Sequence, residues 1–424
     1  MTRTVLRPAR RGRLVTVAVT TGALLAAGVA TALSPAQAVG TELAPYTFTS
    51  QPELVHRWAA LNQVKHEKLT KAQITSLANN VDLVVVKNTD ARTVTLMKSV
   101  NPRLVALVYA NGAFAQKNEG TRFPESWYAR DAAGNKITMP KFGNYLMDIS
   151  NQGWIDQVVA TCLDYKAQSG ADGCYSDMLM TAPLFNNYVS AKPINPRTGK
   201  VWSFKDYQAQ VGVIADAVRT RGGGPNAANG VANGNRWFVT GGGSSKPITD
   251  HADAAHSEIW IRDRSLTVSQ FPSTTEWQQD VDMVAQAEAE GRVLMIETKL
   301  WPKGGEPAPT SDLVQQWHGF TLASYLLGTE GRFTWFLFDV DRTYAGMTTA
   351  DPWDQAPIGA PAGPYSALAD GAFVRSFSTG YVAVNPGATP VVVALPTGTW
   401  QRVGGATESG DVTLAAHSGA IWSD

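Results

Sequence analysis

Residues 54–340 alternate between short apolar runs and segments in which apolar residues recur every three or four positions. The short runs predict strands that are buried on both faces, and the recurrence predicts helices. The predicted strands are 54–61, 81–87, 104–109, 172–178, 236–240, 256–262, 292–298 and 333–339. The predicted helices are 71–79, 93–100, 154–165, 203–222, 273–291 and 311–328.

Eight strands that alternate with helices predict an α/β fold of the (β/α)8 TIM-barrel type, which we place at residues 44–360. A doubly wound parallel sheet is the alternative. No G-x-G-x-x-G follows the first predicted strand, and residues 241–246 lack the spacing of a Walker motif. The sequence therefore gives no nucleotide-binding signature, and we predict a flexible loop at 241–246.

The pattern changes to alternation of period two after Pro361, with Gly and Pro between the segments. Such alternation predicts antiparallel strands with one face buried. The predicted strands are 372–377, 381–385, 391–395, 399–403 and 412–422. Residues 365–424 are therefore predicted to form a small all-β domain, a β-sandwich.

Residues 1–38 have the form of a cleavable signal peptide. Arg3, Arg7, Arg10, Arg11 and Arg13 precede an apolar stretch, and residues 36–38 read Ala-Gln-Ala. A transmembrane anchor is the alternative, although the stretch is rich in Thr, Gly and Ala. We expect an exported, extracellular protein with no membrane span after cleavage.

Composition and charge argue against a nucleic-acid-binding protein. Charged residues make up only 17% of the chain, and 36 Lys and Arg balance 36 Asp and Glu. No basic run follows residue 13, so the chain shows no footprint for nucleic acid. The sequence leaves the oligomeric state undetermined.

Acidic residues stand where the predicted barrel strands end, and in TIM barrels catalytic side chains come from those ends. Strand alternation places Tyr175 and Asp177 on one inward face, and it places Glu258, Trp260 and Arg262 inward or upward. Further candidates for substrate binding lie at strand ends or in the loop before a helix: Tyr109, Asp148, Glu297 and Asp339. Each of them also has a structural interpretation, as a salt-bridged rim residue, a helix cap or a packed aromatic.

Cleavage of a glycosidic bond requires two carboxylates, one that attacks or stabilises and one that donates a proton. The candidates above supply more than two. The six His residues form no H-E-x-x-H or similar spacing, so we expect neither a metal site nor another cofactor. No G-x-S-x-G nucleophile motif is present.

Several segments resemble a known family. They are FPESWYARDAAGNKI (123–137), NYLMDISNQGWIDQVV (144–159), ADGCYSDML (171–179), INPRTGKVWSFKDY (194–207) and HSEIWIR (256–262). The first two resemble a part of TIM-barrel glycoside hydrolases near the active site, and ADGCYSDML resembles their strand "DG-apolar-apolar-x-D". The segment from 380 to 422 is similar to the β-sandwich that follows such barrels. The chain resembles the hypothetical glycosyl hydrolase family 15 and, more distantly, endo-α-1,4-polygalactosaminidases.

The resemblance implies a catalytic Asp after the fourth strand, here Asp177, and a second carboxylate after the sixth, here Glu258. Such pairs are typical of retaining enzymes that act on α-linkages. The pattern also implies an Asn-Gly where this chain has Thr240 to Gly243. Glu297 is an additional carboxylate, which leaves the acid/base open between Glu258 and Glu297. We take Asp177 as nucleophile and Glu258 as acid/base. We expect burial beside Trp260 to raise the pKa of Glu258.

Two other functions fit the sequence. One is a carbohydrate-binding barrel without catalysis, and the other is an exported enzyme such as a polysaccharide deacetylase. A deacetylase usually needs metal ligands, and no His/Asp set is evident. The substrate sugar, the linkage and endo or exo action are not determined by the sequence.

The only two cysteines, Cys162 and Cys174, lie on a predicted helix and the next predicted strand. Cys162 lies on the core face of its helix, and Cys174 lies on the helix-facing side of its strand. A disulfide fits an oxidising compartment, and two buried thiols are the alternative.

Overall fold

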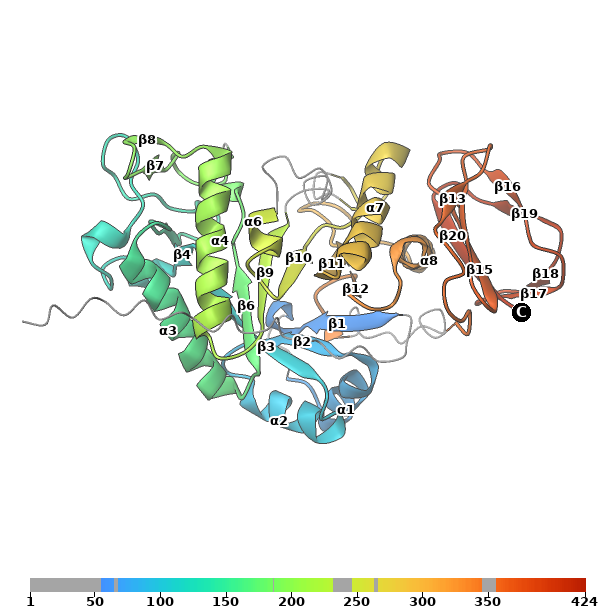
Figure 1. The fold of residues 1–424 in the computed structure, drawn as a ribbon, viewed down its shortest axis with the longest axis horizontal. Helices are drawn as coiled ribbons and strands as arrows, with labels where there is room; N and C mark the ends of the chain where they lie inside the picture. Colours follow the sequence, from blue (N-terminus) through green and yellow to red (C-terminus); the bar gives the residue numbers. More distant parts are fainter. Residues whose placement is uncertain (1–54, 65–67, 186, 232–245, 263–265, 345–355) are drawn as a thin grey trace, which may run out of the picture. The chain divides into compact units, whose positions relative to one another are not determined.

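Eight parallel strands close into a barrel in the order β1-β12-β11-β10-β9-β6-β3-β2 (Figure 1). The computed structural model describes residues 55–64, 68–185, 187–231, 246–262, 266–344 and 356–424. The barrel strands are β1 (His56–Ala60), β2 (Leu83–Val86), β3 (Val105–Asn111), β6 (Gly173–Asp177), β9 (Asn226–Val231), β10 (Ala254–Ser257), β11 (Val293–Lys299) and β12 (Thr334–Asp339). The predicted TIM-barrel fold is confirmed.

Helices follow the strands along the chain, and several begin or end at the residues that the sequence indicates. They are α1 (Lys71–Asn80), α2 (Ala91–Val100), α3 (Gln152–Ser169), α4 (Phe204–Arg221), α6 (Lys246–Thr249), α7 (Thr274–Glu290) and α8 (Ser311–Gly328). Ser203 caps α4 by accepting from the Asp206 N–H, and Ser273 forms a capping box with Glu276 at α7. Gly170 ends α3 in the left-handed conformation, at φ 72°. None of the described helices is long and apolar enough to cross a bilayer.

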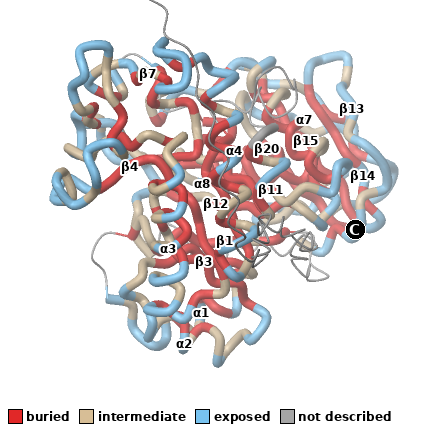
Figure 2. Tube along the Cα trace, turned by 60° about the vertical axis from the view of Figure 1, so that its left-hand side comes forward, coloured by how far each residue is buried: buried red, intermediate tan, exposed pale blue. Residues whose placement is uncertain are grey.

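The parallel register brings polar strand ends to one rim of the barrel. Asn111 of β3 pairs with Asp177 of β6, and Lys299 of β11 pairs with Asp339 of β12. The strands themselves are mostly buried, while exposed residues concentrate in the loops and on outer helix faces (Figure 2). The rim is therefore where side chains from different strands can meet.

The C-terminal part consists of antiparallel sheets, as the period-two pattern predicts. A six-stranded sheet has the order β13-β14-β15-β20-β17-β18, and β16 pairs with β19. These strands are β13 (Ser366–Ala367), β14 (Phe373–Ser376), β15 (Gly380–Asn385), β16 (Val391–Ala394), β17 (Trp400–Arg402), β18 (Thr407–Glu408), β19 (Asp411–Leu414) and β20 (Ser418–Ser423). Two further two-stranded sheets are β4 (Phe114–Ala115) with β5 (Tyr145–Leu146) and β7 (Ile194–Asn195) with β8 (Lys200–Val201).

Three strand predictions need correction. The predicted strand 236–240 lies outside the described residues, and the fifth barrel strand is β9, at Asn226–Val231. The strand predicted at 256–262 corresponds to β10, which spans Ala254–Ser257, and Ile261 beyond it has a positive φ of 62°. The segment 412–422 forms two strands, β19 and β20, which are separated by a turn that contains His417 at φ 47°.

Candidate active site

Asp177, at the end of β6, accepts three hydrogen bonds. The Tyr109 hydroxyl donates to Oδ2 at 2.5 Å, and the Asn229 amide donates to Oδ1 at 2.8 Å. The backbone N–H of Met178 also donates to Oδ1, at 2.8 Å. Three donors around one carboxyl group satisfy its ionised form and fix its orientation.

Asn229 of β9 connects this carboxyl group to Glu258, which directly follows β10. The same amide nitrogen lies 3.4 Å from Glu258 Oε2. Glu258 keeps 25% of its side chain exposed, and Asp177 is half-buried. The structure thus brings together the two carboxylates that the sequence singles out.

A buried ion-pair cluster lies behind Glu258. The ammonium group of Lys299 contacts Glu258 Oε1 and lies 3.2 Å from Glu297 Oε2, and Lys299 is 1% exposed. His256 Nε2 lies 3.2 Å from the same Glu297 oxygen, and His256 Nδ1 contacts the Tyr175 hydroxyl at 2.6 Å. Buried charges are costly unless they are paired, so this cluster holds Lys299 in place beside Glu258.

The electrostatic surroundings of Asp177 act in opposite directions. Burial raises the pKa of Asp177, and the negative charge of Glu258 raises it further. The hydrogen bonds from Tyr109, Asn229 and Met178 lower it, and the net pKa is above the ordinary value. Burial and the Asp177 charge also raise the pKa of Tyr109, so this hydroxyl group remains a donor.

Asp339, at the end of β12, is fully buried beside the cluster. Burial and the charge of Glu297 raise its pKa to about 6, against the hydrogen bond that the Arg342 backbone N–H donates at 3.0 Å. The Trp301 ring near it lies under two cations, with Lys299 Nζ at 4.4 Å and Arg342 Cζ at 3.7 Å from its centroid.

Two residues predicted to contact substrate, Trp260 and Arg262, are buried and hydrogen-bonded within the fold. Trp260 is fully buried, and its indole N–H donates to the Asp280 carbonyl of α7 at 2.9 Å. Arg262 is 3% exposed and donates to the carbonyls of Lys299 and Leu266. The alternation that placed both residues inward stops at Ser257, so neither follows the strand geometry assumed for it.

The remaining candidates are divided between the site and its surroundings. Tyr109 contacts Asp177, whereas Tyr175 is 3% exposed and its hydroxyl group forms a hydrogen bond with His256. Glu297 is fully buried in the ion-pair cluster. Asp148 lies in the loop before α3 and accepts from the backbone N–H and the hydroxyl of Ser150, and Asn151 caps the helix instead.

Sequence reasoning missed Asn229 and Lys299. Asn229-Gly230 is an Asn-Gly pair within β9, and residues 240–243, where the family resemblance implies such a pair, lie outside the described residues. An added Cβ at Gly230 would lie 2.3 Å from the Leu179 carbonyl oxygen, so the strand needs glycine there. The pair was visible in the sequence, but two asparagines and a glycine interrupt the apolar run that signals a buried strand.

A disulfide joins α3 to the strand that carries Asp177. Cys162 and Cys174 are bonded, with their Cα atoms 5.9 Å apart. No cluster of three or more His, Cys, Asp or Glu that could hold a metal ion occurs in the described part of the chain.

A closed parallel barrel with paired carboxylates at its strand ends defines the class of TIM-barrel glycosidases. The chain matches the model of the hypothetical glycosyl hydrolase family 15 over residues 98–381, and it belongs to that family. Comparison with curated proteins finds no match.

Two solved structures illustrate the similarity of fold. The glycoside hydrolase domain of PelA from Pseudomonas aeruginosa has 14% identity and a TM-score of 0.41, covering 70% of this chain and 99% of that one. A GH36 α-galactosidase, AgaA from Geobacillus stearothermophilus, has 10% identity and a TM-score of 0.51, covering 88% of this chain and 55% of that one. At such identities the likeness concerns the fold alone.

Proposed function

We propose that the protein is a retaining glycosidase for α-linked glycans, with Asp177 as nucleophile and Glu258 as general acid/base. The observation that carries the proposal is the shared Asn229 amide, which lies 2.8 Å from Asp177 Oδ1 and 3.4 Å from Glu258 Oε2. These two oxygens are therefore closer together than the sum of those distances. Both carboxyl groups can therefore face one glycosidic bond, and the retaining mechanism is inferred from the pairing of fourth- and sixth-strand carboxylates in the family resemblance.

Asp177 suits the role of nucleophile because three donors hold it. Tyr109, Asn229 and the Met178 N–H stabilise the ionised carboxylate and oppose the effect of the nearby Glu258 charge. A carboxylate held by several donors is oriented for attack on an anomeric carbon.

Glu258 suits the acid/base role better than Glu297 because of exposure. Glu258 has 25% of its side chain exposed, whereas Glu297 has none and lies 3.2 Å from both His256 Nε2 and Lys299 Nζ. A proton donor must reach the glycosidic oxygen. Lys299 stabilises the carboxylate that remains on Glu258 once the proton has left.

The reaction proceeds in two displacements. An Asp177 oxygen forms a bond to the anomeric carbon while the bond to the glycosidic oxygen breaks, and that oxygen takes the proton of Glu258. Glu258 then removes a proton from water, and the water oxygen displaces Asp177. The ionised Asp177 and the protonated Glu258 are regenerated, and the anomeric configuration is retained.

The preference for α-linkages rests on the pairing of fourth and sixth strands in the family resemblance. We also propose that the protein is exported and that residues 1–38 are removed. The Arg-rich start, the apolar stretch and the Ala-Gln-Ala support export, and the mature N-terminus is its test.

The test of the mechanism uses 4-nitrophenyl α-glycosides with proton NMR of the first product. We expect the same anomer as in the substrate. Asp177→Asn and Glu258→Gln should each lower kcat on an unactivated oligosaccharide by about 10²–10⁴-fold while the melting temperature stays unchanged. The inverted anomer, or full activity in either variant, would contradict the assignment.

Azide separates the two roles. With an activated glycoside, Asp177→Ala should yield a glycosyl azide of inverted configuration, because azide takes the place of the missing nucleophile. Glu258→Ala should accumulate the glycosyl-enzyme and release an azide of retained configuration. The reverse outcome would exchange the roles, and activity in the Glu258 variants would shift the acid/base to Glu297. Sugar binding without turnover in the unaltered protein would favour the non-catalytic barrel.

A further inference from the structure

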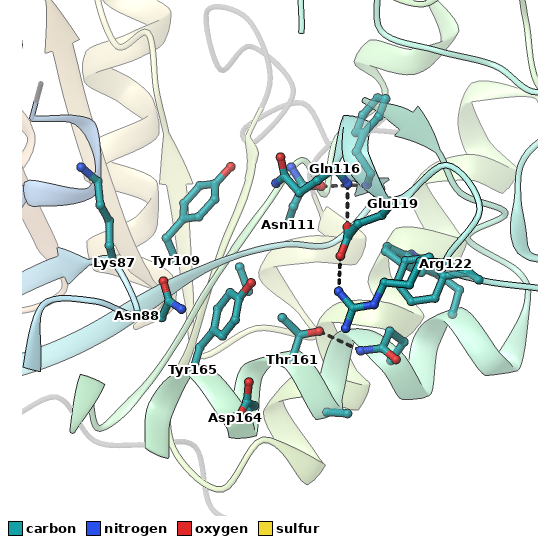
Figure 3. A pocket seen from close by; sticks show the side chains of 16 residues that line it. Lys87, Asn88, Tyr109, Asn111, Gln116, Glu119, Arg122, Thr161, Asp164 and Tyr165 are labelled. Carbon is teal, nitrogen blue, oxygen red and sulfur yellow. Dashed lines mark hydrogen bonds and ion pairs between the residues drawn. The ribbon is translucent and has the colours of Figure 1, made fainter. Parts of the chain in front are cut away.

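A hollow of about 580 Å³ lies beside β3, between the segment that follows this strand and α3 (Figure 3). Its walls come from four parts of the chain: Lys87 and Asn88 after β2, Tyr109 to Asn111 of β3, the segment from Phe114 to Phe123, and α3 from Trp154 to Tyr165. This volume lies within the range of small-molecule and oligosaccharide sites, roughly 300–1,000 Å³.

The hollow shares one residue, Tyr109, with the surroundings of the proposed nucleophile. Tyr109 lines it, and the hydroxyl group of the same Tyr109 contacts Asp177 Oδ2 at 2.5 Å. A second hollow, of about 570 Å³, lies beside it. The two hollows share Gln116, and the second is lined by Lys117, Asn118, Phe142 and Asn144.

The lining has the chemistry that recognises uncharged sugar rings. Amide side chains supply paired donors and acceptors, in Asn88, Asn111, Gln116, Gln157, Asn118 and Asn144. Aromatic faces accompany them, among them the half-buried Tyr165 and Phe142, which is 58% exposed. An aromatic side chain this exposed gains little by packing on its own fold, and it can cover the apolar face of a pyranose.

The charges in the first hollow already have partners within the chain. Arg122 is paired with Glu119, and Lys87 donates to the Val64 carbonyl at 3.2 Å. Asp164 accepts from Gln168 at 2.6 Å. No single sign of charge dominates this surface, so it offers a charged polymer no specific attraction.

We propose that the two hollows form one binding track for an uncharged polysaccharide chain, which runs from Asp177 past Gln116 to Phe142. This proposal rests on the proposed function for its direction, since the cleaved bond lies at the Tyr109 end. Several sugar rings along the track would add binding energy remote from the reacting bond, which makes long chains better substrates than short ones. The enzyme would then act within polymers.

Binding is tested on the full mature chain carrying Asp177→Asn, so that no polymer is degraded. Affinity electrophoresis through gels that contain pullulan, galactomannan or dextran should retard the protein in at least one of them, with no loss at high salt. Phe142→Ala and Tyr165→Ala should weaken that retardation by about five- to tenfold, the effect of one or two aromatic contacts. Phe185→Ala is the matched control, because Phe185 is 46% exposed and lies outside both hollows.

The outcomes separate this proposal from the proposed function. Three results would overturn the track. The protein could be retarded only by the charged polymers polygalacturonate or chitosan, or by none of the polymers. The Phe142 and Phe185 variants could also be retarded equally. Because Phe142 is exposed, its replacement tests the track without endangering the fold, and melting curves verify this for Tyr165→Ala. In the catalytic background, Phe142→Ala should lower kcat/KM on long oligosaccharides and leave 4-nitrophenyl glycosides unaffected. If polymer binding is absent but aryl glycosides are cleaved, the track is wrong and the proposed function stands. If polymer is bound but no glycoside is cleaved, the track stands and the proposed function is wrong.

Discussion

Four carboxyl groups at the site interact in pairs, Asp177 with Glu258 and Asp339 with Glu297. Lys299 contacts two of them directly, Glu258 and Glu297. Burial raises the pKa of Asp177 and of Asp339 above their ordinary values, and the negative charges of Glu258 and Glu297, respectively, raise them further. At the scale of single residues, the site depends on the ammonium group of Lys299, which Glu258 and Glu297 share.

Asp339 provides the pH prediction. Its folded pKa of about 6 exceeds the unfolded value of about 3.9, so the folded state binds the proton more tightly. The free energy of unfolding therefore loses up to about 3 kcal/mol as the pH rises from about 4 to about 6, and this contribution is constant above that. Asp339→Asn carries no charge at any pH and should not show this loss.

The check is urea denaturation of the unaltered protein and Asp339→Asn at pH 4, 5, 6 and 7. The variant should gain stability relative to the unaltered protein across that interval, because its amide oxygen can still accept from the Arg342 N–H. Parallel stability curves for the two proteins would show that Asp339 ionises normally in the fold.

Among the elements, α3 and β6 are linked most directly to the chemistry. The Cys162–Cys174 disulfide joins them only three residues before Asp177. Lys166 of α3 also donates to the Gly222 carbonyl, at 2.8 Å, at the end of α4. The base of the strand that carries the proposed nucleophile is thus held on its outer side.

Replacing both cysteines, as Cys162→Ala with Cys174→Ala, should lower the free energy of unfolding by about 2–3 kcal/mol. The sequence separation is 12, and short loops of this kind contribute about 3 kcal/mol at most in the chain-entropy model. Denaturation of both proteins without reductant measures the difference. Mass spectrometry after alkylation of the unreduced protein is the control, and two alkylated thiols would exclude the bridge.

At the scale of the molecule, the C-terminal sheet buries apolar residues on both faces. Phe373, Val382 and Ile421 pack with residues of α7 and α8, while Val374 and Trp422 pack with β16 and β19. Gly419 of β20 approaches α8 so closely that an added Cβ would lie 2.5 Å from Ala323 Cβ. The guanidinium group of Arg375 donates to the carbonyls of Leu326, Leu327 and Thr329 at the end of α8.

Export belongs to this scale as well. Protein collected from the culture medium should begin at Val39, because cleavage is expected after Ala38 of the Ala-Gln-Ala segment. Mass spectrometry of the N-terminal peptide checks this, with the Ala36→Asp, Ala38→Asp variant as the control that blocks processing. An intact Met1 on the protein in the medium, or retention of all protein in membranes, would contradict the leader assignment.

The sequence by itself determined the features that depend on local pattern. Apolar runs located six of the barrel strands, and the Ser203 and Ser273 caps and Gly170 located helix ends, because burial periodicity and capping act over a few residues. Asp177 was identified for the same reason, as an acidic residue at the end of a strongly apolar strand.

Only the tertiary structure decided the remainder of the barrel and of the site. β9 is buried although it carries Asn226 and Asn229, because Ser176 and Asp177 on the neighbouring strand accept or donate their hydrogen bonds. Trp260 turns toward α7 because the chain leaves the strand at Ser257. Lys299 is buried between two carboxylates that lie 41 and 2 residues away in sequence. A polar residue becomes a strand residue or a site residue only when a distant partner satisfies it, and no local pattern encodes that partner.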